Sequence, residues 1–334
     1  MTSISLLVIN YRSASLAAEA IRTAREASSY PLQVIVVDNS GDPAEAEVLR
    51  TFADVVIVAS RNLGYAGGIN AGRRSCDGEV IVVSNPDVHF GERAIDRLVE
   101  VDAAVAGPAL FWDDAHQWML PPAELQTRSE VIDRVLASRS RGWARRRDRR
   151  RFLARVAFWS LVQATPIQAL SGAVMAIRAA AFDAAGGFDE RFALYFEEND
   201  FLRRVRGEVV YVPAARCRHL YNQSAGASDD AAALYARSEQ LYLRKWGGAF
   251  AKRFEGVLAP AFQATEESQT GYGIVIEASP LASFETAAGH FGSDVAGVSD
   301  DVWAAYRGDV LYLRAVERRT GRVLRSWAKA RIPA

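Results

Sequence analysis

Residues 61–87 read RNLGYAGGINAGRRSCDGEVIVVSNPD. Glycines crowd the first part of this stretch, an apolar run follows at 80–83, and the stretch ends on the lone carboxylate of Asp87. Glycine has no Cβ, so its main chain can approach a ligand closely. An acid at the end of a buried strand lies at the sheet edge where open α/β folds bind ligands. The stretch therefore predicts a site where backbone and a metal meet a diphosphate.

Strand and helix patterns alternate on both sides of this stretch. We expect strands over 5–10, 33–37, 55–58, 79–84, 103–106, 167–177 and 209–212, and helices over 13–28, 66–76, 91–101, 179–185 and 231–246. Repeated βα units predict a mostly parallel sheet with helices on both faces. Strands expected at 273–277, 310–316 and 323–327 predict a change of architecture near the C-terminus. We therefore expect an α/β domain over 1–261 and a small β-rich accessory domain over 262–334.

Composition limits the class of protein. The chain has 334 residues, 50% of them hydrophobic, which is enough for one large domain with an appendage. The formal net charge is zero and gives no argument for nucleic acid. Cys76 and Cys217 lie far apart, which fits a reducing cytosol better than a disulfide framework. No signal peptide is recognisable at Met1. The uncharged stretch 156–177 contains several polar residues, so we interpret it as a helix end followed by a buried strand.

An arginine-rich segment at about 138–160 carries Trp143, Phe152, Phe158 and Trp159 in or beside it. It is either a solvated face or, through 139–159, an amphipathic surface that contacts anionic lipid headgroups. No nucleic-acid-binding motif accompanies it, so nucleic acid is not expected as a partner.

The glycine stretch differs from two well-known phosphate-binding patterns. It contains no G-x-G-x-x-G, and the acid Asp38 precedes the glycines instead of following them by about 20 residues. The Gly-Lys-Ser/Thr of a P-loop is absent as well. These departures argue against a classical NAD enzyme or a P-loop ATPase. Asp38 and Asn39 follow a buried strand, where an acid either binds a ribose or base edge or forms an Asx turn.

Acidic residues gather again at Glu197, Glu198 and Asp200. The helix dipole favours acids at a helix start, yet the apolar residues around this cluster would raise a carboxyl pKa and suit a general base. Asp87 could hold Mg²⁺ or Mn²⁺ or cap the next helix. His219 becomes a metal-ligand candidate only if the fold brings it to Asp87.

Six segments of the chain, in this order, resemble the inverting family 2 glycosyltransferases of the GT-A fold, especially bacterial rhamnosyltransferase-like members. They are 7–12 (LVINYR), 36–40 (VVDNS), 62–70 (NLGYAGGIN), 85–87 (NPD), 170–173 (LSGA), and 187–190 (GFDE) leading to Glu198. The resemblance covers roughly residues 3–250. It implies a Rossmann-like mixed sheet flanked by helices.

The resemblance also implies roles for individual residues. Nucleotide and donor binding would fall to Asn10, Tyr11, Asp38, Asn39, Asn62, Gly64, Gly67, Asn70 and Asn85. Ser171 and Gly172 would contact the acceptor, and Asp87 and His219 would hold Mg²⁺ or Mn²⁺. Glu198 would be the catalytic base, beside Glu197 and Asp200. The family's Asp-x-Asp is here Asn85-Pro86-Asp87, and its Glu-Asp pair is Glu197-Glu198, so Asp200 remains a rival for the role of base.

By this resemblance the chain is an inverting glycosyltransferase of surface polysaccharide biosynthesis in the cell envelope. The favoured donor is dTDP-rhamnose, with UDP- and GDP-sugars open, and the acceptor is a glycan or a polyprenyl-linked glycan. We expect a cytoplasmic protein. Peripheral contact with the inner face of the plasma membrane and a homodimer are both left open. Two other classes stay under consideration. One is a sugar-nucleotide-forming nucleotidyltransferase, although its lysine-bearing N-terminal loop is missing, and the other is a non-catalytic carbohydrate-binding protein.

Overall fold

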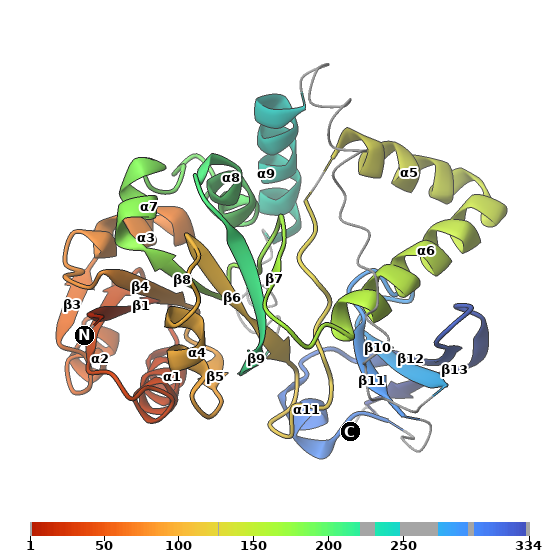
Figure 1. Ribbon diagram of the computed structural model, residues 1–334, viewed down its shortest axis with the longest axis horizontal. Coiled ribbons are helices and arrows are strands. Elements are labelled where there is room, and N and C mark those ends of the chain that lie inside the picture. Colours follow the sequence, from red (N-terminus) through yellow and green to blue (C-terminus); the bar gives the residue numbers. More distant parts are fainter. Residues whose placement is uncertain (1, 126, 221–230, 248–272, 293–296, 332–334) are drawn as a thin grey trace. The chain divides into compact units, whose positions relative to one another are not determined.

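The computed structural model describes residues 2–125, 127–220, 231–247, 273–292 and 297–331. The chain divides into two compact units, which Figure 1 shows as ribbons. The first unit comprises residues 1–109, 123–125 and 163–245, and the second comprises 110–122, 126–162 and 246–334. The predicted domain boundary at 261/262 lies outside the described residues and stays a prediction.

The first unit is built on a mixed sheet of the order β3-β2-β1-β4-β8-β6-β9-β5, with β7 paired to β9. Its parallel half consists of β1 (Ile4–Asn10), β2 (Leu32–Asp38), β3 (Val55–Val58) and β4 (Val80–Ser84). The other half contains β5 (Val88–Phe90), β6 (Val105–Phe111), β7 (Thr165–Pro166), β8 (Val174–Arg178) and β9 (Val209–His219). Its recorded pairings are antiparallel. A mixed α/β fold is thus confirmed.

The helices of this unit are α1 (Ala14–Glu26), α2 (Pro43–Leu49), α3 (Gly64–Arg73), α4 (Ala94–Val99), α7 (Ala179–Ala184), α8 (Glu197–Arg204) and α9 (Ala231–Trp246). α1 buries Ala17, Ala20, Ile21 and Ala24, a spacing of three to four residues that forms one apolar face. All of β1 and β4 is buried, as expected for strands covered on both faces.

The sheet geometry determines where a site can form. β1 and β2 run parallel with Asn10 opposite Asp38, and β4 runs parallel to β1 on its other side. The residues that follow these strands therefore share one edge of the sheet. The short strand β5 lies directly after Asp87 and pairs with the end of β9, so that Val88 is opposite His219. The sequence had not predicted this strand.

The second unit contains a helical hairpin, α5 (Arg128–Arg139) and α6 (Arg141–Trp159), together with α11 (Asp300–Ala305). Its antiparallel sheet has the order β11-β10-β12-β13, formed by β10 (Ile274–Ser279), β11 (Ala288–Phe291), β12 (Val310–Glu317) and β13 (Val323–Ala330). The small β-rich C-terminal element is therefore confirmed. The basic segment 138–160, which we had assigned to the first domain, groups with this sheet.

Buried charges join α6 to the C-terminal sheet. Glu277 is fully buried, and its two carboxylate oxygens lie 2.6 Å from Arg155 Nη2 and 2.7 Å from Arg314 Nη2. Phe152 and Trp159 of the basic segment are buried too, and the Trp159 indole donates to Leu120 O over 2.9 Å. These aromatic rings pack inside the second unit and are not available to a lipid surface.

The stretch 156–177 contains the end of α6, then β7, and most of β8. The interpretation as a helix end followed by a buried strand agrees with this arrangement. Across the described ranges, no helix combines the length and the apolar character that crossing a bilayer requires.

Candidate active site

Asp38 is fixed at the edge of the first sheet. It is fully buried, and its oxygens accept hydrogen bonds from Asn10 Nδ2 at 3.1 Å, Ser40 N at 3.0 Å and Ser40 Oγ at 2.9 Å. The hydrogen bond from Ser40 N to the Asp38 side chain forms an Asx turn. The sequence had left this turn open as the alternative to nucleotide binding by Asp38. Tyr11 follows Asn10 and is about half exposed (51%), with the Arg12 guanidinium 5.5 Å from its ring centre. Nucleotide binding by these residues stays a prediction.

The glycine loop is held by side chains on both sides. Gly64 has a φ of +71°, and a Cβ there would lie 2.5 Å from Ala193 O, so only glycine fits. Asn39 Nδ2 donates to Gly64 O over 3.0 Å, and Asn39 Oδ1 accepts from Leu63 N over 3.3 Å. Asn62 Oδ1 accepts from Gly64 N over 2.8 Å. Asn39 and Asn62 thus fix the loop that the sequence proposed as the donor pocket.

The side chain of Asn70 forms hydrogen bonds to other residues of this chain. Its Nδ2 donates to Phe188 O at 2.8 Å and to Glu190 Oε1 at 2.9 Å, and its Oδ1 accepts from Phe188 N at 2.9 Å. Gly187 has a φ of +70°, and a Cβ there would lie 2.7 Å from Asn70 Oδ1. Asn70 therefore joins α3 to the 186–190 loop. A Cβ on Gly67, one turn earlier, would lie 3.0 Å from Leu63 Cβ.

Asp87 and His219 meet, as the metal hypothesis required. The pairing of β5 with β9 places His219 Nε2 3.4 Å from Asp87 Oδ1. Burial tends to raise the pKa of Asp87, but the neighbouring imidazole outweighs it and the pKa falls below its usual value. Asn85 stands two residues earlier, and its N–H donates to Ala173 O over 2.9 Å.

The residues present fit a divalent cation. Asp87 Oδ1 is buried, and no hydrogen bond of normal geometry from the described residues reaches it. Mg²⁺ is commonly bound by one or two protein ligands plus substrate phosphates. No cluster of three or more His, Cys, Asp or Glu that could hold a metal occurs in the described parts of the chain. Asp87 and His219 are thus a partial ligand set that phosphate oxygens and water would have to complete.

Tyr65 connects the glycine loop to the acidic cluster. Its hydroxyl donates to Gly172 O over 2.7 Å. A Cβ on Gly172 would lie 3.4 Å from Glu198 Cβ and 3.5 Å from Glu198 Cγ, so the 171–173 loop rests against that side chain. Burial raises the pKa of Tyr65 well above 10, and the charges of Glu197, Glu198 and Asp87 add to this effect. Tyr65 therefore remains protonated and keeps its role as a donor.

Glu197 and Glu198 begin α8 with different environments. Burial raises the pKa of Glu198 to about 7, although backbone N–H groups oppose the shift, and Asn199 Nδ2 donates to Glu198 Oε1 over 3.1 Å. Burial raises the pKa of Glu197 well above its ordinary value, and the charge of Glu198 raises it further. A carboxyl group that titrates near neutrality suits a general base. Glu198 has this property, whereas the pKa of Glu197 is raised well above its ordinary value.

Asp200 is engaged elsewhere. It is fully buried, with Oδ1 2.7 Å from Lys245 Nζ and Oδ2 3.0 Å from Arg204 Nε. Both oxygens are thus paired with cations, so Asp200 fits a structural role better than that of a base. Tyr195 and Phe196, just before α8, both have left-handed backbones with φ of 70° and 69°. Such non-glycine strain costs about 1–3 kcal/mol per residue and is common near active sites.

Three residues that contact the predicted site residues, or the loop beside them, were not named from the sequence. Tyr65, Asn199 and Lys245 each contact the acidic cluster or the loop beside it. Tyr65 stood inside the quoted glycine stretch, where its aromatic side chain among glycines was the available signal. Neither Asn199 nor Lys245 carries a local sequence signal, because each acts on a partner that only the fold identifies.

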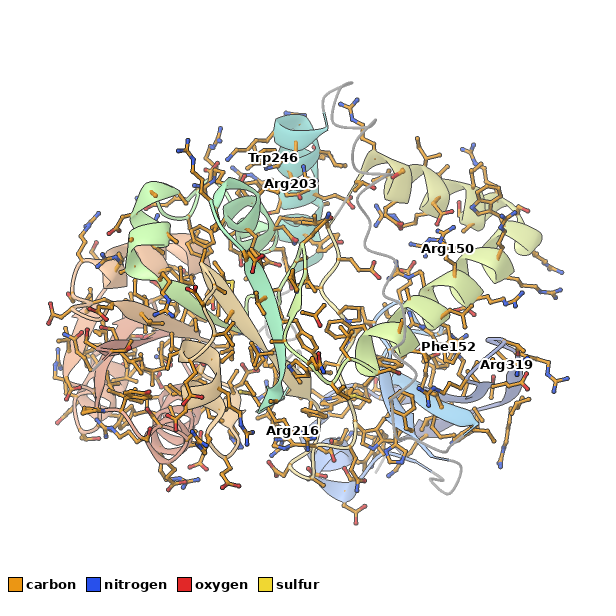
Figure 2. All side chains as sticks on the ribbon, in the orientation of Figure 1. Arg150, Phe152, Arg203, Arg216, Trp246 and Arg319 are labelled. Atoms are coloured by element: carbon orange, nitrogen blue, oxygen red, sulfur yellow. The ribbon has the colours of Figure 1, made fainter. Side chains whose placement is uncertain are left out.

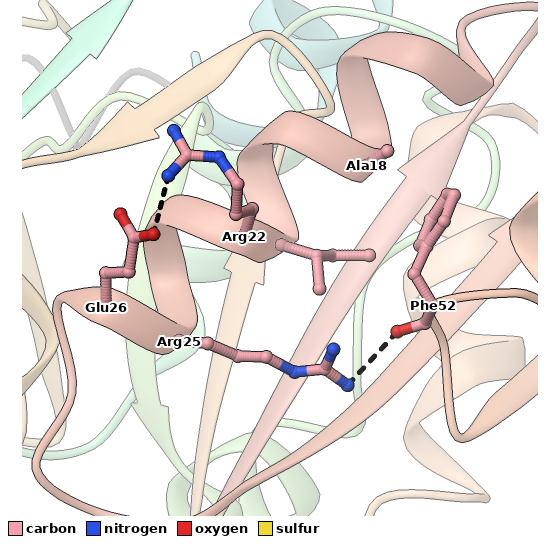
Figure 3. Close-up of a pocket in the computed structure, with 6 residues that line it drawn as sticks. Ala18, Arg22, Arg25, Glu26 and Phe52 are labelled. Atoms are coloured by element: carbon pink, nitrogen blue, oxygen red, sulfur yellow. Dashed lines mark hydrogen bonds and ion pairs between the residues drawn. The ribbon is translucent and has the colours of Figure 1, made fainter.

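A cavity of about 400 Å³ lies elsewhere in the first unit, as Figure 3 shows. It is lined by Ala18, Ile21, Arg22, Arg25, Glu26 and Phe52. Arg22 pairs with Glu26 over 2.6 Å and Arg25 donates to Phe52 O over 3.1 Å, so these polar groups satisfy one another. None of the residues predicted for the site lines this cavity.

Comparisons with known proteins bear on this geometry. Residues 5–152 match the model of the family described as Glycosyl transferase family 2. The N-acetylglucosaminyl-diphospho-decaprenol L-rhamnosyltransferases of two Mycobacterium tuberculosis strains are 28% identical over 246 residues, 65% of this chain and 75% of theirs. The crystal structure of GalNAc-T7 with UDP, GalNAc and Mn²⁺ matches with a TM-score of 0.50 and 13% identity, over 79% of this chain and 52% of that one. The chain thus spans about half the length of the GalNAc-T7 structure, and that likeness concerns the fold.

The family match includes the parallel strands, the glycine loop and Asp87. It favours a glycosyltransferase over the two competing classes, a nucleotidyltransferase and a non-catalytic carbohydrate-binding protein. The structure adds two observations. The carboxyl group of Glu198, whose pKa is raised, lies against the 171–173 loop, and Asp87 lies beside His219. From the sequence match, the relatives and the fold, we conclude that this chain is a glycosyltransferase with the GT-A fold, and that its residues 5–152 are similar to glycosyltransferase family 2.

Proposed function

We propose that the protein transfers L-rhamnose from dTDP-rhamnose to a polyprenyl-linked glycan acceptor, with inversion at the anomeric carbon. The main support is the relationship to the two mycobacterial proteins, whose name describes L-rhamnosyl transfer to N-acetylglucosaminyl-diphospho-decaprenol. The choice of thymidine as the nucleoside and the place of the product in a surface polysaccharide rest on the resemblance of the motifs. A homodimer and a cytoplasmic location stay predictions.

The proposed mechanism uses Glu198 as the base. Its carboxylate removes a proton from the acceptor hydroxyl, and the acceptor oxygen attacks the anomeric carbon from the face opposite the leaving group. The sugar–phosphate bond breaks, and the nucleoside diphosphate leaves with the electron pair. The Asn199 amide orients the Glu198 carboxylate, and Tyr65 holds the 171–173 loop against its stem.

The charge on the leaving group needs a counterpart. Asp87 and His219 are the residues that would hold Mg²⁺ or Mn²⁺, and a bound divalent cation neutralises charge on phosphate oxygens. In this proposal the glycine loop lets the main chain approach the donor closely, because glycine has no Cβ. Asp38 and Tyr11 would contact the nucleoside in this proposal.

The test compares wild-type protein with Glu198→Gln. Transfer should fall by about 10²–10⁴-fold, since that is the usual contribution of a general base. Affinity for dTDP-rhamnose should change little, because the base acts on the acceptor. Transfer is measured as acceptor-dependent release of nucleoside diphosphate from dTDP-, UDP- and GDP-sugars, and affinity by calorimetry.

Glu100→Gln serves as the matched control, because Glu100 is an exposed acid that pairs only with Arg93 among its recorded ion pairs. It should keep full activity. Unchanged turnover in Glu198→Gln would refute the assignment of the base. Transfer from a different nucleotide sugar in preference to dTDP-rhamnose would refute the proposed donor.

A further inference from the structure

The helix α5 has its acidic residues, Glu130 and Asp133, paired with arginines of α6. Asp133 is buried, and its Oδ2 lies 2.8 Å from Arg147 Nε and 2.6 Å from Arg150 Nη2. Asp133 Oδ1 also accepts from the Trp143 indole over 2.7 Å. Figure 2 shows Arg150 between the two helices, whereas Phe152 points to the other side of α6, toward the C-terminal sheet. The contact between α5 and α6 is therefore made largely by ion pairs.

The opposite side of α5 is apolar and faces solvent. Ile132, Val135 and Leu136 are 53%, 42% and 40% exposed. The spacing of three and four residues puts them on one face, and exposed Arg128 and Arg139 continue that face at its two ends. We call these five residues the α5 face. Ordinary surface helices bury their apolar side, so contiguous exposed apolar residues of this kind mark an interaction site.

The surroundings of the α5 face are positively charged. The exposed charged residues of 128–150 are all arginines, namely Arg128, Arg139, Arg141, Arg145, Arg146, Arg149 and Arg150. The three acids of the same range are Glu130, Asp133 and Asp148, and each pairs with an arginine. None of these three acids is fully exposed to solvent. The hairpin therefore presents apolar side chains within a field of positive charge.

We propose that the α5 face docks on an anionic lipid surface. Aliphatic side chains would enter the boundary between headgroups and acyl chains, and the arginines would lie among the lipid phosphates. A second copy of this hairpin would bring like charges together, so charge complementarity favours an anionic bilayer over self-association. The inference rests on the proposed function only for its biological role, because docking would bring the enzyme to a polyprenyl-linked acceptor in the membrane.

The experiment is co-sedimentation of the full chain with vesicles. One set contains phosphatidylcholine alone, and the other contains phosphatidylcholine with phosphatidylglycerol. Wild-type protein should bind the anionic vesicles and lose binding as salt rises, since each arginine near the surface contributes on the order of fivefold at low salt. The triple variant Ile132→Ser, Val135→Ser, Leu136→Ser should bind the anionic vesicles at least about tenfold more weakly, because insertion needs the aliphatic chains.

The matched control is Val323→Ser, Leu324→Ser on β13, which removes apolar side chains of similar exposure (43% and 45%). It should bind vesicles as the wild type does. Circular dichroism and thermal unfolding confirm that each variant is folded. Transfer to a short water-soluble acceptor should be equal in all three proteins, which separates a failure of docking from a failure of the enzyme.

Three outcomes would overturn the proposal. They are absence of wild-type binding to anionic vesicles at low salt, equal binding by the triple variant, and a wild-type dimer that the triple variant abolishes in vesicle-free sedimentation. The last result would assign the α5 face to a second copy of the chain.

Discussion

Asn199 illustrates how one side chain can adjust the chemistry of its neighbour. Its amide donates to Glu198 Oε1 over 3.1 Å, a bond that favours the ionised carboxylate. Because Glu198 has a pKa of about 7, activity should fall as the pH drops through 7 and the base becomes protonated. In Asn199→Ala the loss of this bond should raise that pKa, and the acidic limb of kcat/KM should move to higher pH by about half a unit to one unit.

The pH profile of kcat/KM separates this positioning role from a merely structural one. A structural defect lowers the plateau at high pH and leaves the limb where it was. An acidic limb at the wild-type pH in Asn199→Ala would therefore show that the amide does not act on the base.

At the scale of elements, α9 holds the segment that carries the proposed base, Glu198. Lys245 Nζ lies 2.7 Å from Asp200 Oδ1 in α8 and 2.7 Å from Asp189 Oδ2 in the preceding loop. Ser238 Oγ donates to Leu194 O over 2.8 Å. Lys245→Met should lower the free energy of unfolding by about 1–3 kcal/mol, because a buried carboxylate loses a charged partner. Urea denaturation measures this change.

Lys329→Met provides the comparison, since the Lys329 ammonium lies over the Trp303 ring at 4.5 Å. It should cost less than about 1 kcal/mol, as a partly exposed cation–π contact does. Equal effects of the two substitutions would argue against a special role for the link between α8 and α9.

Local pattern predicted the elements of the first unit better than their partners. The strands β1, β2 and β4 were predicted because they are continuous apolar runs. β5 was not, because it has three residues and acquires its pairing from β9 about 130 residues later. The same pairing between distant segments brings His219 to Asp87. The sequence could name His219 as a metal-ligand candidate only on the condition that the fold did this. Asp200 and Glu198 looked equivalent until Lys245 and Arg204 were seen to occupy Asp200.

The second unit was harder to predict. Arginines interleaved with Trp and Phe suggested a lipid-facing α6, yet Phe152 and Trp159 are buried. The reason is Glu277, a buried acid of the C-terminal sheet that attracts Arg155 and so turns this face of α6 inward. Nothing within the 138–160 segment indicates that partner.

At the scale of the whole molecule, two compact units predict two responses to heat. Ligand binding raises the stability of the unit that holds the ligand, by about 2.7 kcal/mol at a concentration one hundred times Kd. dTDP and Mn²⁺ together should raise the transition of the first unit more than either alone, and leave that of the second unit unchanged. In Asp87→Asn the extra shift due to Mn²⁺ should vanish. Differential scanning calorimetry resolves the two transitions.

Asp183→Asn is the control, because Asp183 is an exposed acid of the first unit that pairs with Arg73. Its Mn²⁺ response should match that of the wild type. A full Mn²⁺ response in Asp87→Asn would remove Asp87 from the metal site.

The contacts of the glycine loop determine when, during translation, this loop can reach its final structure. Gly64 closes against Ala193, and Asn70 closes on Phe188, so both contacts must wait until synthesis has passed residue 193. The span that matches the family model ends at residue 152. A nascent chain or a fragment of that length would already possess Asp38, the glycines and Asp87 but would lack the segment that fixes their loop. The proposed donor pocket would thus form late in translation, although nearly all its residues are made early.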